Sequence, residues 1–175
     1  VKELICKIID TPTGNDYIEM RAKGFEEISP QRKYHGISTQ IIAQIKNVRV
    51  PFNVDIGVGD IIVPRAEERT INTQLPDFEA PVIKTYSLES TIAEKFDAIL
   101  QRFELTGRMK DFYDIYYLSR TFDFEGAKLQ AAIFETLQRR GTPYDKNSFK
   151  RVVALANDED MQKRWKFFLK NIKDL

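Results

Sequence analysis

The chain has 175 residues, of which 42% are hydrophobic and 30% are charged, and its formal net charge is +1. These values are ordinary for a soluble globular protein, and the small net charge excludes a chain that attracts nucleic acid over its whole surface. The single cysteine, Cys6, excludes an intrachain disulfide framework and indicates a reducing compartment. No apolar run approaches the roughly 20 residues that span a bilayer. We therefore expect a cytoplasmic protein without a membrane segment.

The first part of the chain predicts one helix and then three strands. Val1–Asp10 has apolar residues at helical spacing, and Tyr17–Lys23 alternates apolar and polar residues as a half-buried strand does. The polar stretch Glu26–Gly36 predicts a loop. Strand alternation returns in Ile37–Ile45 and again in Phe52–Val58. Three consecutive strands with short links favour an antiparallel meander.

The third of these strands carries an unusual polar face. Asn53, Asp55 and Gly57 alternate with apolar residues, although aspartate is disfavoured in strands and glycine weakens them. The glycine removes a side chain beside the Asp55 carboxylate, which would leave room for a metal ion or a phosphate. The same face can also point to water, because exposed polar faces are common in antiparallel sheets. The strand alone does not decide between the two interpretations.

A connector separates these strands from the rest of the chain. Val63–Val82 contains three prolines and shows little periodicity, and connectors of this length often link domains. We place the boundary near Lys84. This divides the chain into an α/β core, residues 1–83, and a helical region, residues 84–175.

The helical region predicts five helices. Ser87 can cap the first, whose apolar stripe runs from Leu88 to Phe103. Gly107 interrupts the pattern before the second helix, Arg108–Arg120. Three more helices follow. Asp123 is predicted to cap the first of them, which Gly141 closes, and the other two start at Asn147 and Asp158.

Charged residues lie at helical spacing in the first two of these helices. Lys95 is in the middle of the first, and Arg108, Asp111 and Asp114 share a face of the second. If the helices pack as a hairpin around Gly107, the lysine is held near the carboxylates as a point charge that can bind a triphosphate. A salt-bridge network along two solvated faces explains the same spacing. The pattern alone predicts an α+β domain with a candidate site for an anionic ligand.

A resemblance to a known family rests on two helix motifs, SLESTIAEKFDAI at 87–99 and GRMKDFYDIYYL at 107–118. Together they resemble the AbiEii/AbiGii-type nucleotidyltransferase-like toxins, the toxic halves of bacterial toxin–antitoxin pairs linked to abortive phage infection. The stretch PFNVDIGVGD at 51–60 is similar to the family strand that carries a third acidic residue. The paired motif is fairly specific, because AEK is followed after a short interval by R-x-K-D-x-x-D.

The resemblance implies a fold like that of DNA polymerase β-type nucleotidyltransferases, an antiparallel or mixed sheet followed by helices. It assigns Asp55 to the third carboxylate of the metal site and Lys95 to the lysine that contacts the nucleotide phosphates. Asp111 and Asp114 match acidic positions of the last motif, and which of the two is functional stays open. The candidate catalytic residues are Asp55, Lys95, Asp111 and Asp114. The candidate nucleotide-binding residues are Ser87, Lys95 and Arg108.

The same resemblance implies cofactors and partners. Family members bind a nucleoside triphosphate with a divalent cation, so Mg²⁺ and a nucleoside triphosphate are expected here. Some relatives are similar to enzymes that add nucleotides to the acceptor end of tRNA and so block translation. We therefore expect tRNA or another RNA as the acceptor, and a cognate antitoxin as a partner.

One part of the family pattern is absent from the sequence. The family begins with a Gly-Ser or Gly-Gly turn, a helix and a strand with an Asp-x-Asp pair, which supplies the first two metal ligands. The resemblance maps Val1–Asp10 onto the helix that follows this pair. One carboxylate cannot hold both the attacking hydroxyl and the leaving pyrophosphate. We therefore expect the C-terminal portion of a nucleotidyltransferase, inactive by itself.

Two alternatives remain. The first is a degenerate module that binds nucleotide, RNA or an antitoxin without chemistry, and the second is a helical domain that binds a partner. A truncated sheet would expose an edge strand and apolar surface, so self-association of the chain is also expected.

Overall fold

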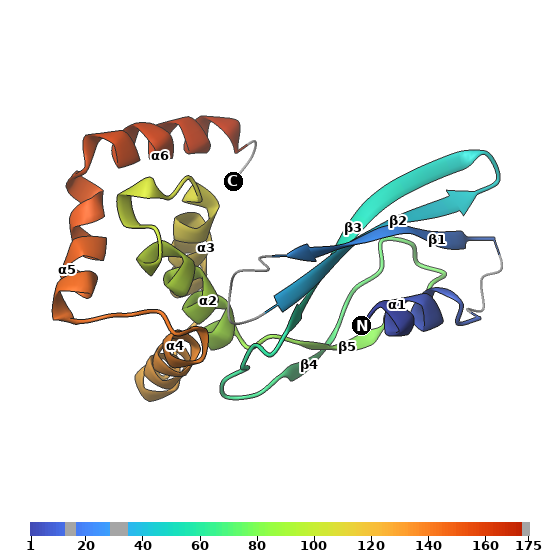
Figure 1. Ribbon diagram of the computed structural model, residues 1–175, viewed down its shortest axis with the longest axis horizontal. Coiled ribbons are helices and arrows are strands. Elements are labelled where there is room, and N and C mark those ends of the chain that lie inside the picture. The colour runs from blue at the N-terminus through green and yellow to red at the C-terminus, as the bar shows by residue number, and fades with distance from the viewer. Residues whose placement is uncertain (13–16, 29–34, 173–175) are drawn as a thin grey trace. The chain divides into compact units, whose positions relative to one another are not determined.

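The computed structural model describes residues 1–12, 17–28 and 35–172. The chain divides into two compact units, Val1–Asp60 and Ile61–Leu175 (Figure 1). The sequence instead places a domain boundary near Lys84, and that division into domains stays a prediction. The connector belongs to the second compact unit because it is hydrogen-bonded to the helix that follows it. The Val63 carbonyl accepts bonds from the hydroxyls of Ser87, at 2.5 Å, and Ser90, at 3.1 Å.

The first unit contains a helix and a three-stranded antiparallel sheet. The helix is α1, Lys2–Ile9, and the strands are β1, Glu19–Ile28, β2, His35–Ile45, and β3, Val48–Val58. The order β1-β2-β3 with antiparallel pairing confirms the predicted meander. Because Ile5 is the buried residue of α1 and the helix contacts β1, the predicted amphipathic helix is also confirmed.

β1 extends further than its sequence pattern predicts. Residues 26–28, predicted as loop, pair with β2 through the register Glu26↔Ser38, Glu27↔Ile37 and Ile28↔Gly36. Backbone hydrogen bonds to β2 hold these residues in the sheet, and the glutamate side chains are exposed. A polar exposed face does not prevent strand pairing, so this part of the loop prediction was wrong. Residues 29–34 of the same prediction lie outside the described residues.

The second unit begins with a hairpin that the sequence analysis missed. β4, Glu67–Thr70, pairs antiparallel with β5, Val82–Thr85. The sequence pattern predicts little regular structure between residues 63 and 82, because each strand is only four residues long and β4 reads EERT. Cross-strand contacts, rather than a local apolar alternation, define this hairpin, and the Thr85 hydroxyl donates to the Glu67 carbonyl at 3.1 Å.

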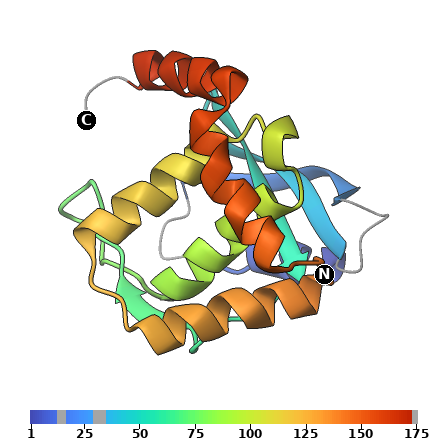
Figure 2. The same cartoon turned by 90° about the vertical axis from the view of Figure 1, so that its left-hand side faces the viewer.

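The rest of the second unit is helical (Figure 2). Its elements are α2, Leu88–Leu100; η1, Phe103–Leu105; α3, Met109–Thr121; α4, Gly126–Arg140; α5, Lys146–Ala154; η2, Leu155–Asn157; and α6, Glu159–Asn171. α2 packs against α3, α4 and α5, and α3 packs against α6. The α+β class that the sequence predicts is confirmed. No helix in the described part of the chain is long and apolar enough to cross a membrane.

Helix caps follow the sequence prediction at some ends and depart from it at others. Ser87 caps α2, as predicted, by accepting the backbone N–H of Ser90. Asp158, predicted as the start of the last helix, is the N-cap of α6 and accepts the N–H of Met161. Asp123 does not cap α4, which starts after Glu125 without a side-chain cap. α5 starts one residue before the predicted Asn147, because Asp145 forms a capping box with Ser148. Gly141 ends α4 with φ 66°, as the C-terminal glycine signal predicts.

One apolar cluster joins α2 to the C-terminal helices. Its buried members come from α2, α3, η2 and α6 and are Ile99, Met109, Leu155 and Met161. The partly buried residues packed on them are Phe112, Ile115, Val152, Trp165 and Phe168. A second contact region is aromatic, where Phe149 of α5 stacks on Phe96 of α2 with ring centroids 5.9 Å apart. These contacts fix the rotation of α2 about its axis and so decide which of its residues face α3.

An ion pair attaches α5 to the turn between α2 and α3. Arg151 donates to both carboxylate oxygens of Glu104, with its Nε 2.8 Å from Oε1. Its guanidinium also lies over the Phe103 ring, 4.1 Å from the centroid. The hydrogen bond from Arg151 is the largest of the effects that lower the pKa of Glu104, from its ordinary 4.5 to about 2.

The stabilising effect of this ion pair is expected to depend on pH. A lowered folded-state pKa means that the stabilisation is complete above pH 4.5 and disappears as the pH falls towards about 2. We therefore expect Glu104→Gln to have a lower Tm than wild type at neutral pH, with the two Tm values converging between pH 4.5 and 2. Thermal unfolding followed by circular dichroism checks this. Glu135→Gln, at an exposed position of α4, is the control and should show no such convergence, and a Tm gap for Glu104→Gln that persists to pH 2 would contradict the assignment.

Candidate functional site

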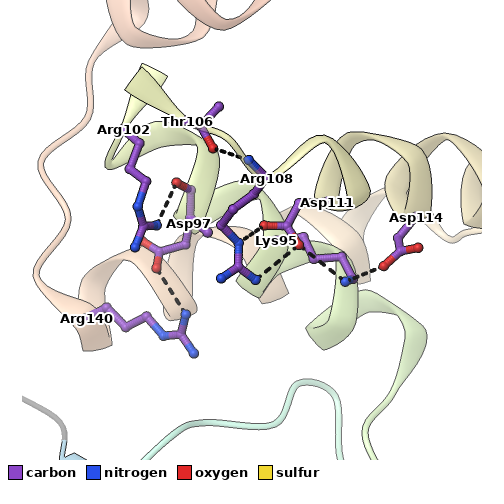
Figure 3. A network of polar contacts seen from close by, with 9 residues as sticks. Lys95, Asp97, Arg102, Thr106, Arg108, Asp111, Asp114 and Arg140 are labelled. Carbon is purple, nitrogen blue, oxygen red and sulfur yellow. Dashed lines mark hydrogen bonds and ion pairs between the residues drawn. The ribbon is translucent and has the colours of Figure 1, made fainter. Parts of the chain in front are cut away.

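Lys95 of α2 lies against the first turns of α3. Its Nζ is 2.6 Å from Oδ2 of Asp114 and 3.6 Å from Oδ1 of Asp111. Figure 3 shows the ammonium group between the two carboxylates. The approach of the two charged faces that the helical spacing predicts is therefore confirmed. The Lys95 side chain keeps 21% of its surface exposed, so the ammonium group is held by the protein but is not closed off from solvent.

Arg108 adds a second cation at the start of α3. Its Nε and Nη2 donate to the two oxygens of Asp111, and the Nη2–Oδ1 distance is 3.3 Å. The Arg108 side chain is 58% exposed, whereas that of Asp111 is 3% exposed. Asp111 also lies in the first turn of α3, where the helix dipole favours a carboxylate. Asp111 is thus a buried anchor that orients the two cations, and Arg108 extends from it into solvent.

The two acidic residues differ in accessibility. The Asp114 side chain is 24% exposed and contacts Lys95, while Asp111 contacts both Lys95 and Arg108. We call Lys95, Arg108, Asp111 and Asp114 the Lys95 cluster. An ammonium group has three N–H donors and a guanidinium has five. The contacts to Asp111 and Asp114 occupy fewer donors than the Lys95 ammonium has, so Lys95 can also donate to an anionic oxygen such as that of a phosphate.

A second charged network lies on α2 and was not predicted. Asp97 is 1% exposed and accepts hydrogen bonds from Arg140 at 3.1 Å, from Gln101 at 2.9 Å and from the Thr142 hydroxyl. Figure 3 shows the contact between Asp97 and Arg140. Arg140 also pairs with Glu94 at 3.3 Å. These bonds hold the end of α4 against α2. The two helices run side by side in Figure 2. Ala93 and Leu100, at helical spacing from Asp97, are buried, so its position pointed to a buried carboxylate that needs a partner.

Ser87 has a structural environment. Its side chain is fully buried, its hydroxyl donates to the Val63 carbonyl, and it accepts the N–H of Ser90. Its predicted contact with a nucleotide is not tested by these bonds, but the hydroxyl already has a donor and an acceptor within the protein.

Asp55 lies in the first unit, on the polar face of β3. It stands opposite Ser38 of β2, whose hydroxyl donates to Oδ1 of Asp55 at 2.6 Å. The sequence predicts room for a ligand beside Gly57, but another side chain lies there. A Cβ built on Gly57 would lie 3.2 Å from Oδ2 of Asp60, so the carboxylate of Asp60 occupies this place. The glycine lets a carboxylate of the same chain approach the strand.

Comparison with protein families decides what kind of protein carries these residues. A family model described as "Nucleotidyl transferase AbiEii toxin, Type IV TA system" matches residues 1–175. The chain belongs to the AbiEii family. The resemblance drawn from the helix motifs is therefore confirmed, and the match includes both compact units. No curated protein matches the chain, and no solved structure does.

Membership in the AbiEii family makes this a nucleotidyl transferase toxin of the type IV toxin–antitoxin systems. It implies a nucleotide substrate and a cognate antitoxin. A divalent metal is general among nucleotidyltransferases, but within the described ranges no group of three or more His, Cys, Asp or Glu side chains is arranged to hold one. Asp55 offers a single carboxylate, already bonded to Ser38. The described residues by themselves do not make a metal site.

Proposed function

We propose that the Lys95 cluster binds the phosphates of a nucleoside triphosphate, and that the full-length protein transfers a nucleotide from it to an RNA acceptor, for which tRNA is our first choice. The observation that supports this most is the position of the Lys95 ammonium between Asp111 and Asp114. A surface lysine loses much of its rotamer freedom when it binds an anion. Here the two carboxylates already hold the ammonium group in place, which lowers that cost.

The residues of the cluster take different roles in this proposal. Lys95 is the phosphate-binding point charge, and Arg108, whose side chain is 58% exposed, adds positive charge beside it. Asp111 orients Arg108 from a buried position, and Asp114 holds Lys95 from a partly exposed one. Asp55 remains a proposed ligand of Mg²⁺ through one oxygen. The proposed location is the cytoplasm, where nucleotide and tRNA are available.

A second candidate function follows from the incomplete set of metal ligands among the described residues. The sequence has no Asp-x-Asp strand of the family type, and the described residues do not complete a metal site. The chain would then bind nucleotide, RNA or an antitoxin without transferring a nucleotide. This candidate keeps the role of Lys95 in binding but removes the chemistry.

Lys95→Ala separates these possibilities in the full-length protein. Transfer of a labelled nucleotide to tRNA is expected to fall at least about 10-fold, because a charge-assisted hydrogen bond contributes about 1.5–3 kcal/mol. Binding of a fluorescent nucleoside triphosphate should weaken by a similar factor. Lys110→Ala, at an exposed lysine of α3, is the matched control and should retain both activities.

Each outcome of this experiment assigns one function. Equal transfer by wild type and Lys95→Ala would remove Lys95 from the site. Nucleotide binding that depends on Lys95, without any transfer by the wild-type protein, would favour the non-catalytic module.

A further inference from the structure

Residues 163–170 of α6 read KRWKFFLK, with four basic side chains and no acidic one. The structure separates the three aromatic residues of this run. Trp165 and Phe168 stack on each other with centroids 5.7 Å apart and pack beside Tyr113 of α3. Phe167 is 71% exposed. A large aromatic ring is therefore presented to solvent in the middle of a basic helix.

Lysines surround Phe167 on the exposed side of α6. Lys163, Phe167 and Lys170 follow one another at spacings of four and three residues, and Lys166 is the neighbour of Phe167, so these residues share one side of the helix. Lys163 pairs with Asp160 at 3.2 Å, but both side chains are more than 70% exposed, so this pair is weak. Neither Lys166 nor Lys170 forms an ion pair with a described carboxylate. The side of α6 around Phe167 is positively charged.

This side of α6 borders a pocket of about 600 Å³ between α6 and the turn before α3. The lining residues are Gly107, Met109, Lys163, Arg164, Phe167, Phe168 and Asn171. A Cβ on Gly107 would meet no atom within 4 Å, so the pocket is open there. Arg164 donates to the carbonyls of Thr106 and Glu104, at 2.8 and 3.1 Å, which holds its guanidinium in the pocket wall. None of the carboxylates in the described part of the chain forms an ion pair with it. Gly107 directly precedes Arg108 of the Lys95 cluster.

We propose that this basic groove, with Lys163, Lys166, Phe167 and Lys170 at its edge, binds single-stranded RNA. A base stacks on the exposed ring of Phe167, and the lysines contact the backbone phosphates, which is how proteins hold single strands without sequence readout. The inference deepens the proposed function, because an acceptor strand in this groove lies beside the turn that carries Arg108. It rests on that function only for the identity of the RNA as acceptor.

The other polyanion that a basic helix can meet is an anionic membrane surface. Membrane-surface helices bury a broad apolar face that includes several large side chains. In α6 the large apolar residues Trp165 and Phe168 pack inward, and Phe167 and Leu169 are its exposed large apolar side chains, at 71% and 41%. The exposed face is thus mainly charged, which favours RNA.

Fluorescence anisotropy with a labelled 12-nucleotide single-stranded RNA of mixed sequence tests the groove in the full-length protein. Phe167→Ala is expected to weaken binding about 5- to 150-fold, the loss typical of one stacked base. The double variant Lys166→Gln/Lys170→Gln should weaken binding and reduce the slope of log K against log salt by about 1.4, or 0.7 for each phosphate contact. The matched controls are Phe122→Ala, at a ring 42% exposed, and Lys128→Gln/Lys146→Gln, at exposed lysines of α4 and α5.

The outcomes separate this proposal from its alternatives. Wild-type affinity in both groove variants, or an equal loss in the control lysine variant, would overturn it. So would binding to phosphatidylserine vesicles that depends on Phe167 while RNA affinity does not. Phe167→Tyr should restore binding, which shows that a ring is needed at this position. Lys95→Ala should retain RNA affinity, because Lys95 is not part of the groove. If the wild-type protein binds RNA in this groove but transfers no nucleotide, only the proposed function is rejected.

Discussion

Replacing Asp97 by alanine is expected to destabilise the second unit by about 3–5 kcal/mol, the usual loss when one partner of a buried ion pair is removed. Asp97 is 1% exposed and the side chain of its partner Arg140 is 9% exposed. The variant removes the carboxylate to which this guanidinium donates at 3.1 Å. Gln101 and Thr142 lose an acceptor at the same time.

Urea unfolding followed by the fluorescence of Trp165 measures this loss, because Trp165 is the only tryptophan and packs within the second unit. Asp160→Ala is the control. Its carboxylate pairs with Lys163, but it is 72% exposed, and pairs of this kind contribute about 0–1 kcal/mol. If Asp97→Ala and Asp160→Ala have the same stability, the Asp97 network does not hold α4 against α2.

The local elements of this fold were largely predictable because they depend on residues close in sequence. The helical stripe of α2 and its Ser87 cap are examples, since a cap and its helix lie within one turn. The meander followed from strand alternation in the same way. The contact of Lys95 with the carboxylates of α3 was predictable because a short turn joins the two helices.

Features that depend on distant residues could not be predicted. Asp97 and Arg140 are separated by 43 positions, and nothing in the sequence near Asp97 names that partner. The β4–β5 hairpin was missed for a similar reason, because four-residue strands have too little pattern to recognise. The carboxylate of Asp60 beside Gly57 depends on a turn whose course the strand pattern does not specify. For the Asp97 network and the hairpin, a contact between residues far apart in sequence decides the structure. For Asp60, the course of a single turn does.

Asp111→Asn and Asp114→Asn are expected to separate stability from function within the Lys95 cluster. Asp111 is 3% exposed and contacts two cations, so its loss should cost about 1–3 kcal/mol. This is less than for Asp97, because the Arg108 side chain is 58% exposed and can be solvated. Asp114 is 24% exposed, and Lys95 keeps Asp111 as a partner, so Asp114→Asn should cost about 1 kcal/mol or less.

The functional effect is expected in the opposite order once both variants are compared as folded protein. Asp114→Asn releases the Lys95 ammonium from its 2.6 Å contact, so nucleotide transfer by the full-length protein should fall although Tm is nearly unchanged. Asp111→Asn should have a lower Tm, and its nucleotide transfer should fall only in proportion to the fraction of unfolded protein. Unfolding curves and labelled-nucleotide transfer, measured on the same preparations, check both. A stable, fully active Asp114→Asn beside a folded, inactive Asp111→Asn would instead assign the functional carboxylate to Asp111, because the buried anchor would then act on the nucleotide through Arg108.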